Sequence, residues 1–169
     1  MSSSDGASVL PDQIEYVRPY LDAQCWISAL SGQGPYANNL AQVLASADDA
    51  QLVIVTSTLL PLEVLGGNYD QRTAETAEQA LRALSRSSVA QVAPGRRVVL
   101  DARDLRVRLN LKAMDAVHLA SAAAGAADAF LTNDRQLLNQ RHHRGVPIIL
   151  PEWYGAFPLK YPENGPDEG

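Results

Sequence analysis

Short apolar runs alternate along this chain with longer segments of helical periodicity. Residues 51–55, QLVIV, are apolar and β-branched on both faces, which is typical of a strand buried on both sides of a parallel sheet. Further strands are expected in EYVRPYLDA ending near Asp22, and in SVAQVA, DAFLT and VPIIL. Strands that alternate with helices predict an α/β fold, in which helices cover both faces of a parallel sheet.

Helices are expected between these strands. The segments are CWISALSG, stopped by Gly32, then residues 35–50, a helix with Pro61 in its first turn, 70–86, about 95–109, 113–124 and the short NDRQLLNQ. In the helix over 70–86, Ala74, Ala77, Leu81 and Leu84 are expected to face inward. Gly66 and Gly67 are expected to end the helix before it. The helix over 113–124 is rich in alanine and should pack close to its neighbours.

Length and composition indicate one domain without disulfides. The chain has 169 residues, and we expect one domain over 14–151, a flexible segment over 1–13 and an acidic tail over 152–169. The single cysteine, Cys25, is expected to be a buried apolar residue in a reducing compartment. No signal-like start and no apolar run of about 18 residues is present, so we expect a cytoplasmic protein without a membrane span.

Positive charge is concentrated in one part of an acidic chain. The formal net charge is −5, but basic residues gather between residues 82 and 112. Such a stretch is either a solvated helical face or a surface that holds the phosphates of RNA. The candidate RNA-binding residues are Arg82, Arg86, Arg96, Arg97, Arg103, Arg106, Arg108 and Lys112.

Four acidic residues stand where a parallel sheet would deliver them to one crevice. Asp22 ends the first strand, Asp134 follows the fourth, and Glu63 and Asp115 begin helices. Ligands of open parallel sheets bind beyond the carboxyl ends of the strands. Clustered carboxylates repel one another, which raises at least one pKa and favours a hard cation such as Mg²⁺ or Mn²⁺. Taken singly, each acid has a structural alternative: helix capping for Asp22 and Asp134, and favourable first-turn charge for the others.

Several segments resemble one known family. YLDAQCWISAL, VTSTLLPLEVL, KAMDAVHLASAAAGAADAFLTND and VPIIL, together covering about residues 18–150, resemble PIN-domain ribonucleases, most closely the VapC-type toxins of type II toxin–antitoxin modules. The resemblance implies a three-layer α/β/α sandwich with the first and fourth strands side by side. It also implies Mg²⁺- or Mn²⁺-dependent hydrolysis of RNA, a small antitoxin protein as partner, and a homodimer.

The resemblance also implies roles for individual residues. Asp22, Glu63, Asp115 and Asp134 match the family's acidic quartet; Asp22 and Asp115 are expected to touch metal most directly, and the other two to orient water or bind a second ion. Ser57 and Asn133 match supporting polar positions. His118 lies on the helical face of Asp115, as a ligand, a proton relay or a hydrogen-bonding neighbour.

Other interpretations of the pattern stay open. A PIN-like scaffold that holds RNA or protein without catalysis is the main alternative. A haloacid-dehalogenase-like phosphatase fits less well, because it would want Asp-x-Asp where this chain has Asp22-Ala23-Gln24. His142 and His143 lie in the basic segment QRHHRG, where exposure to solvent is expected, whereas Trp26 is expected in the core.

Overall fold

A six-stranded sheet lies at the centre of the part of the chain that the structure describes. The computed structural model describes residues 17–64 and 71–154. Within them the strands are β1 (Pro19–Leu21), β2 (Ile54–Ser57), β3 (Val89–Val92), β4 (Ala129–Leu131), β5 (His142–His143) and β6 (Val146–Ile149). Their order is β3-β2-β1-β4-β6-β5, and all pairs are parallel except β5 with β6. The predicted neighbourhood of the first and fourth strands is therefore confirmed.

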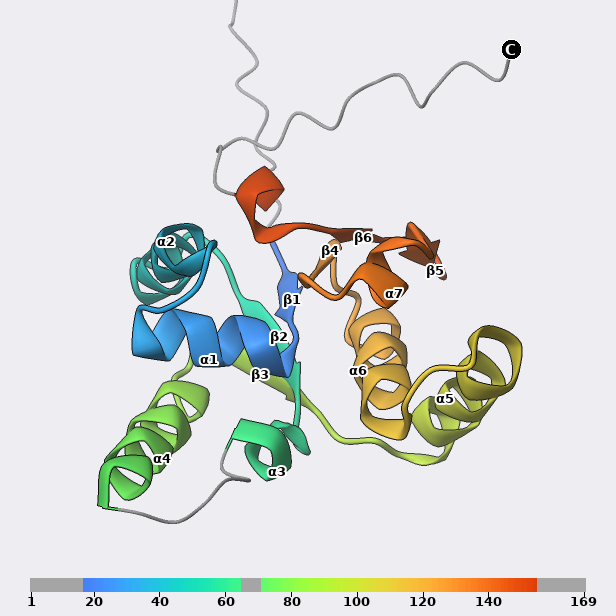
Figure 1. Ribbon diagram of the computed structural model, residues 1–169, viewed down its shortest axis with the longest axis horizontal. Coiled ribbons are helices and arrows are strands. Elements are labelled where there is room, and N and C mark those ends of the chain that lie inside the picture. Colours follow the sequence, from blue (N-terminus) through green and yellow to red (C-terminus); the bar gives the residue numbers. More distant parts are fainter. Residues whose placement is uncertain (1–16, 65–70, 155–169) are drawn as a thin grey trace, which may run out of the picture.

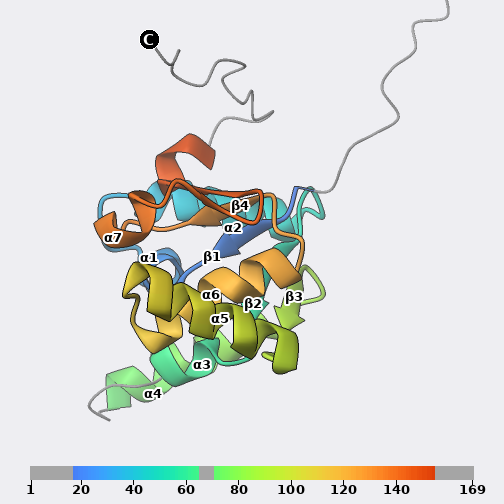
Figure 2. The ribbon, with the colours of Figure 1, turned by 90° about the vertical axis from the view of Figure 1, so that its right-hand side faces the viewer.

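Helices cover both faces of the sheet, as the alternating pattern predicted (Figure 1). One face carries α1 (Ala23–Ser31), α2 (Ala37–Asp48), α3 (Leu60–Val64) and α4 (Gln71–Leu84), which share one apolar cluster. The other carries α5 (Arg96–Leu109), α6 (Ala113–Ala124) and α7 (Arg135–Leu138), which share a second cluster. Figure 2 views the molecule from the side of α5 and α6. A short 3-10 helix, Pro151–Tyr154, follows β6. The three-layer α/β/α architecture is confirmed.

Helix α6 packs very close to the sheet, as its alanine content predicted. Its bounds match the prediction, and Ala116, Ala120 and Ala122 are buried. Gly125, directly after it, has no room for a side chain. A Cβ there would lie 2.6 Å from Cγ1 of Val55 and 2.8 Å from Cγ2 of Val92. The end of α6 is thus pressed against β2 and β3.

Two details of the predicted elements are wrong. Strand β2 begins at Ile54 instead of residue 51, because its neighbour β1 begins only at Pro19 and an isolated bridge joins Leu52 to Val17. Leu81, expected to face inward, is 45% exposed. Leu84 is buried as expected, and Ala77 is half-buried. Over residues 77–84 the other buried positions of α4 are Ala80 and Ala83, whereas the side chain of Ala74 lies outside the described part of the chain.

The hairpin of β5 and β6 was not predicted. His142 is exposed as expected, but His143 is buried, so the expectation of exposure is wrong for that residue. Nε2 of His143 donates to a carboxylate oxygen of Asp101 on α5, at 2.8 Å. A polar partner distant in the sequence therefore draws this side chain out of solvent.

Some predictions lie partly or wholly outside the described residues. These are the flexible segment over 1–13, most of the acidic tail over 152–169, and the end of the helix at Gly66 and Gly67. The domain limits of 14 and 151 stay predictions. Among the helices that the structure describes, none is long and apolar enough to cross a membrane.

Candidate functional site

The pairing of β1 with β4 brings two predicted acids together. Leu21 is in register with Leu131, and the next residue on β1, Asp22, donates its backbone N–H to the carbonyl of Leu131 at 3.3 Å. The hydroxyl of Thr132 donates to one carboxylate oxygen of Asp22 and accepts the backbone N–H of Asp134 at 3.0 Å. One threonine thus holds Asp22 and Asp134 in fixed relation, although they are far apart in the sequence.

A cavity of about 500 Å³ opens at this edge of the sheet. Its lining includes the four predicted acids, Asp22, Glu63, Asp115 and Asp134. The other polar side chains in its wall are Gln24, Lys112, His118 and Asn133. The cavity lies at the carboxyl ends of β1 and β4, where parallel sheets bind ligands. The carboxylates of four separate segments therefore meet at one place.

Two of the acids, Asp22 and Asp134, also cap helices, which is the structural role that the sequence offered as an alternative for each of them. Oδ1 of Asp22 accepts the N–H of Cys25 at 2.8 Å and begins α1. Oδ1 of Asp134 accepts the N–H groups of Gln136 and Leu137, at 2.7 and 3.4 Å, and begins α7. A carboxylate oxygen has two lone pairs, so capping leaves further acceptor capacity toward the cavity. Capping fixes where these carboxylates lie.

The electrostatics of the cavity disfavour ionised carboxyl groups. Burial raises the pKa of Asp22 above its ordinary value, against the hydrogen bonds from Thr132 and Cys25. Burial also raises the pKa of Asp115, and the charges of Asp134 and Glu63 add to that shift. A bound cation would favour the ionised forms and relieve this repulsion.

A chain of hydrogen bonds under the cavity was not predicted from the sequence. The Tyr20 hydroxyl is bonded to Nδ1 of His118 at 2.6 Å, and Nε2 of His118 is bonded to Glu63. Opposite an ionised Glu63, Nε2 carries the proton, and in the neutral imidazole the Tyr20 hydroxyl then donates to Nδ1. Burial raises the pKa of Tyr20 well above its ordinary value, which keeps the phenol protonated as a donor. One feature of the sequence could have indicated the position of Tyr20. Tyr20 lies two residues before Asp22, and alternate residues of a strand share a face.

Comparison with known sequences identifies the family. Residues 20–142 match the PIN domain family. The chain belongs to the PIN domain family. Comparison with curated proteins gave no match.

Solved structures share the fold of this PIN domain at low sequence identity. A Mycobacterium tuberculosis VapC20 toxin that cleaves the sarcin–ricin loop has a TM-score of 0.61 at 14% identity, over 76% of this chain and 99% of that one. Rickettsia felis VapBC2, bound to a promoter DNA fragment, has a TM-score of 0.58 at 16% identity, over 79% and 98%. A Klebsiella pneumoniae toxin–antitoxin complex has a TM-score of 0.54 at 21% identity, over 79% and 97%.

The donor set of this PIN domain suits a hydrated hard cation. Carboxylate and amide oxygens are the ligands that Mg²⁺ and Mn²⁺ prefer. Within the described ranges, no three His, Cys, Asp or Glu side chains converge tightly enough to hold an ion by themselves. Mg²⁺ commonly takes one or two carboxylates and keeps several waters, for which a cavity of about 500 Å³ has room. The geometry therefore fits a partly hydrated ion better than a closed cage.

The supporting residues take different positions. Asn133 lines the cavity. Ser57 is buried at the end of β2, where its hydroxyl accepts the N–H of Leu59 at 3.2 Å, and it is not part of the cavity wall. Trp26 is buried in the core, as expected.

The predicted RNA-binding residues do not all lie together. Arg82 pairs with Glu78 at 3.0 Å and Arg86 with Asp48 at 2.9 Å, on the face of the sheet that α2 and α4 cover. The remaining six belong to α5 or to the turn before α6, on the other face; they are Arg96, Arg97, Arg103, Arg106, Arg108 and Lys112. Of the eight, Lys112 alone lines the acidic cavity.

Proposed function

We propose that this PIN domain is a Mg²⁺- or Mn²⁺-dependent endoribonuclease that hydrolyses phosphodiester bonds of RNA. The observation that carries the proposal is the meeting of Asp22, Glu63, Asp115 and Asp134 at one cavity beyond the carboxyl ends of β1 and β4. Unpaired carboxylates are costly to gather, as the raised pKa values of Asp22 and Asp115 indicate. Binding of a divalent cation for the hydrolysis of a phosphodiester would account for this clustering of carboxylates.

The chain's own residues would divide the work. Asp22 and Asp115 would bind the ion most directly, while Glu63 and Asp134 would orient water. When bound, the ion would polarise a phosphoryl oxygen and lower the pKa of a bound water. His118 holds Glu63 through Nε2 and is itself held by Tyr20, so the orientation of Glu63 is fixed before substrate binds. Lys112, at the rim, would neutralise a substrate phosphate.

The partners follow from the same proposal. The six cations of α5 and the turn after it would hold the RNA backbone, whereas Arg82 and Arg86 already face carboxylates on the other face. The solved structures with this fold include a VapC toxin and toxin–antitoxin complexes. We therefore infer a cytoplasmic toxin, dimeric with a second copy of itself, that a small antitoxin protein neutralises.

Cleavage of RNA by an Asp22→Asn variant tests the proposal. The purified chain is incubated with labelled RNA and Mn²⁺, and the rate should fall at least about 100-fold, the scale on which loss of one charge-stabilising group acts. Asp48→Asn is the matched control, because Asp48 pairs with Arg86 away from the cavity. Circular dichroism verifies that both variants fold. Cleavage by Asp22→Asn at the wild-type rate would contradict the assignment.

A non-catalytic scaffold is the second candidate. It is favoured by one observation, the lack of a tight three-ligand cluster among the described residues. The scaffold predicts RNA binding without cleavage and no gain in heat stability from millimolar Mn²⁺, because only a ligand that binds the native state raises its stability. A rise in melting temperature with Mn²⁺, together with metal-dependent cleavage, would exclude it.

A further inference from the structure

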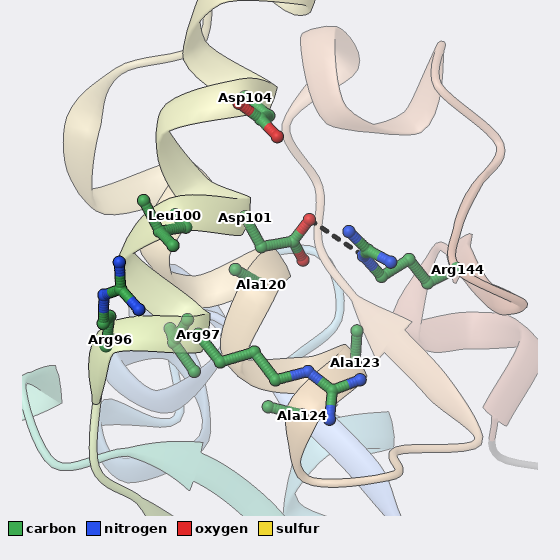
Figure 3. A pocket seen from close by; sticks show the side chains of 10 residues that line it. Arg96, Arg97, Leu100, Asp101, Asp104, Ala120, Ala123, Ala124 and Arg144 are labelled. Carbon is green, nitrogen blue, oxygen red and sulfur yellow. Dashed lines mark hydrogen bonds and ion pairs between the residues drawn. The ribbon is translucent and has the colours of Figure 1, made fainter.

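A second polar cavity lies away from the acidic one. It has a volume of about 670 Å³ and lies between α5, the C-terminal half of α6 and the turn after β5 (Figure 3). Arginine and aspartate side chains surround a floor of Ala120, Ala123 and Ala124. It shares no lining residue with the acidic cavity. The small floor residues let a ligand approach the helix backbone closely.

One cation of this cavity is held in place and still has free donors. Nε of Arg144 donates to Oδ1 of Asp101 at 2.8 Å, and the other oxygen of Asp101 accepts from His143 at 2.8 Å. Asp101 thus has both oxygens engaged within the protein. Over residues 17–64 and 71–154, the two terminal nitrogens of Arg144 have no hydrogen-bond partner. They are positioned donors at the wall of the cavity.

A second cation, Arg97, has no ion-pair partner among the described side chains. Figure 3 shows it stretched along the cavity, with its guanidinium beside Ala123 and Ala124, while Arg96 is turned toward Leu100 at the rim. Both arginines lie in the first turn of α5, which contains no acid. Positive charge at a helix N-terminus opposes the helix dipole, so this arrangement is unfavourable until an anion arrives.

We propose that this cavity binds a phosphate group. The guanidinium groups of Arg97 and Arg144 supply fork-shaped donors that match phosphate oxygens. The proposal rests on the proposed function in one respect: the phosphate belongs to the RNA strand whose cleavage takes place in the acidic cavity. Helix α6 joins the two sites, because Ala113 lines the acidic cavity at one end of the helix and Ala124 lines the phosphate cavity at the other. Twelve helical residues span roughly 18 Å, so a bound strand would contact both sites several nucleotides apart.

One side chain opposes the phosphate and so gives a test of opposite sign. Asp104 also lines the cavity, is exposed, and has no ion-pair partner in the described part of the chain. Its carboxylate would repel a bound phosphate. Removing the charge of Arg97 should therefore weaken binding, and removing that of Asp104 should tighten it.

The experiment measures binding of a short single-stranded RNA to the full chain in EDTA, by fluorescence anisotropy at several salt concentrations. Arg97→Gln should weaken binding about tenfold and reduce the slope of log affinity against log salt by about 0.7, the value for one phosphate contact on a single strand. Asp104→Asn should tighten binding. Arg82→Gln and Glu78→Gln, which change charge by the same amounts on α4, should leave both quantities within twofold.

Orthophosphate and adenosine monophosphate, titrated against the same variants, separate the sources of the phosphate. If Arg97→Gln weakens RNA binding and both small anions bind weakly, the phosphate is that of a strand. If the small anions lose affinity in Arg97→Gln while RNA does not, the pocket serves a free phosphate compound. Equal effects of Arg97→Gln and Arg82→Gln on the binding of every ligand would overturn the proposal that this cavity binds a phosphate group. Because no metal is present, this result is independent of whether the acidic cavity cleaves RNA.

Discussion

Replacing Asp115 by Asn should change the stability of the protein in opposite directions without and with metal. Asp115 lies in the first turn of α6 and accepts no hydrogen bond from the described residues, so the change removes a charge without removing a bond. Burial, with the charges of Asp134 and Glu63, raises its pKa. A carboxyl group whose pKa is raised on folding destabilises the native state once pH exceeds that pKa. At pH 7 without metal, Asp115→Asn should therefore raise the free energy of unfolding, by less than about 1 kcal/mol.

Bound Mn²⁺ should reverse the order of stability of the wild type and Asp115→Asn. A ligand present at 100 times its Kd stabilises the native state by about 2.7 kcal/mol. For a domain of this size, 1 kcal/mol shifts the melting temperature by about 2–4 °C, so saturating Mn²⁺ should raise the wild-type melting temperature by roughly 5–10 °C. Asp115→Asn removes one proposed direct ligand and should lose most of that gain. The variant should melt above the wild type in EDTA and below it in Mn²⁺.

Thermal unfolding followed by circular dichroism at pH 7 measures both effects. Asp104→Asn is the matched control: it removes an exposed charge on α5 outside the acidic cavity, so its response to Mn²⁺ should equal that of the wild type. An equal metal-induced rise in wild type and Asp115→Asn would refute the role of Asp115. No rise in either protein would refute the metal site itself.

Three further predictions concern packing, acid stability and the hydrogen-bond chain. Gly125→Ala should destabilise the fold by about 1–3 kcal/mol in urea unfolding, because its methyl group would overlap Val55. Burial acts to raise the pKa of Asp101. The hydrogen bonds from His143 and Arg144 outweigh burial and hold that pKa below its ordinary value. Asp101 therefore stabilises the fold at neutral pH and loses that contribution as pH falls through its folded pKa, so Asp101→Asn should cost about 1–3 kcal/mol at pH 7 and progressively less below pH 4. Tyr20→Phe should lower the rate of RNA cleavage with unchanged affinity for RNA, because His118 loses the donor that holds it.

Local pattern predicted the elements and the position of the acids. The helix over 113–124 was predicted with its observed bounds, because alanine has the highest helix propensity and Gly125 directly follows the run. Asp22 and Asp134 could be assigned to one edge of the sheet because Asp22 directly follows β1 and Asp134 lies three residues after the end of β4, both short apolar strands. The order of the strands came from the family resemblance rather than from the pattern.

Contacts between distant segments could not be predicted in this way. His143 is buried because Asp101 lies 42 residues earlier, and Tyr20 supports His118 across 98 residues. Local periodicity places Tyr20 on the face of Asp22, but it does not identify the bonding partner of Tyr20 or of His143. The orientation of Leu81 was predicted wrongly for a related reason: the contacts of α4 with α1 and α3 set its buried side, which includes Ala80, Ala83 and Leu84.

The pairing of β1 with β4 has a consequence for synthesis. Thr132 and Asp134 complete a cavity whose first wall, Asp22, leaves the ribosome more than a hundred residues earlier. A nascent chain that ends before Ala129 lacks both the central strand partner and the fourth carboxylate. Such a polypeptide cannot assemble the acidic cavity, so the proposed nuclease activity requires that nearly the whole domain has been translated.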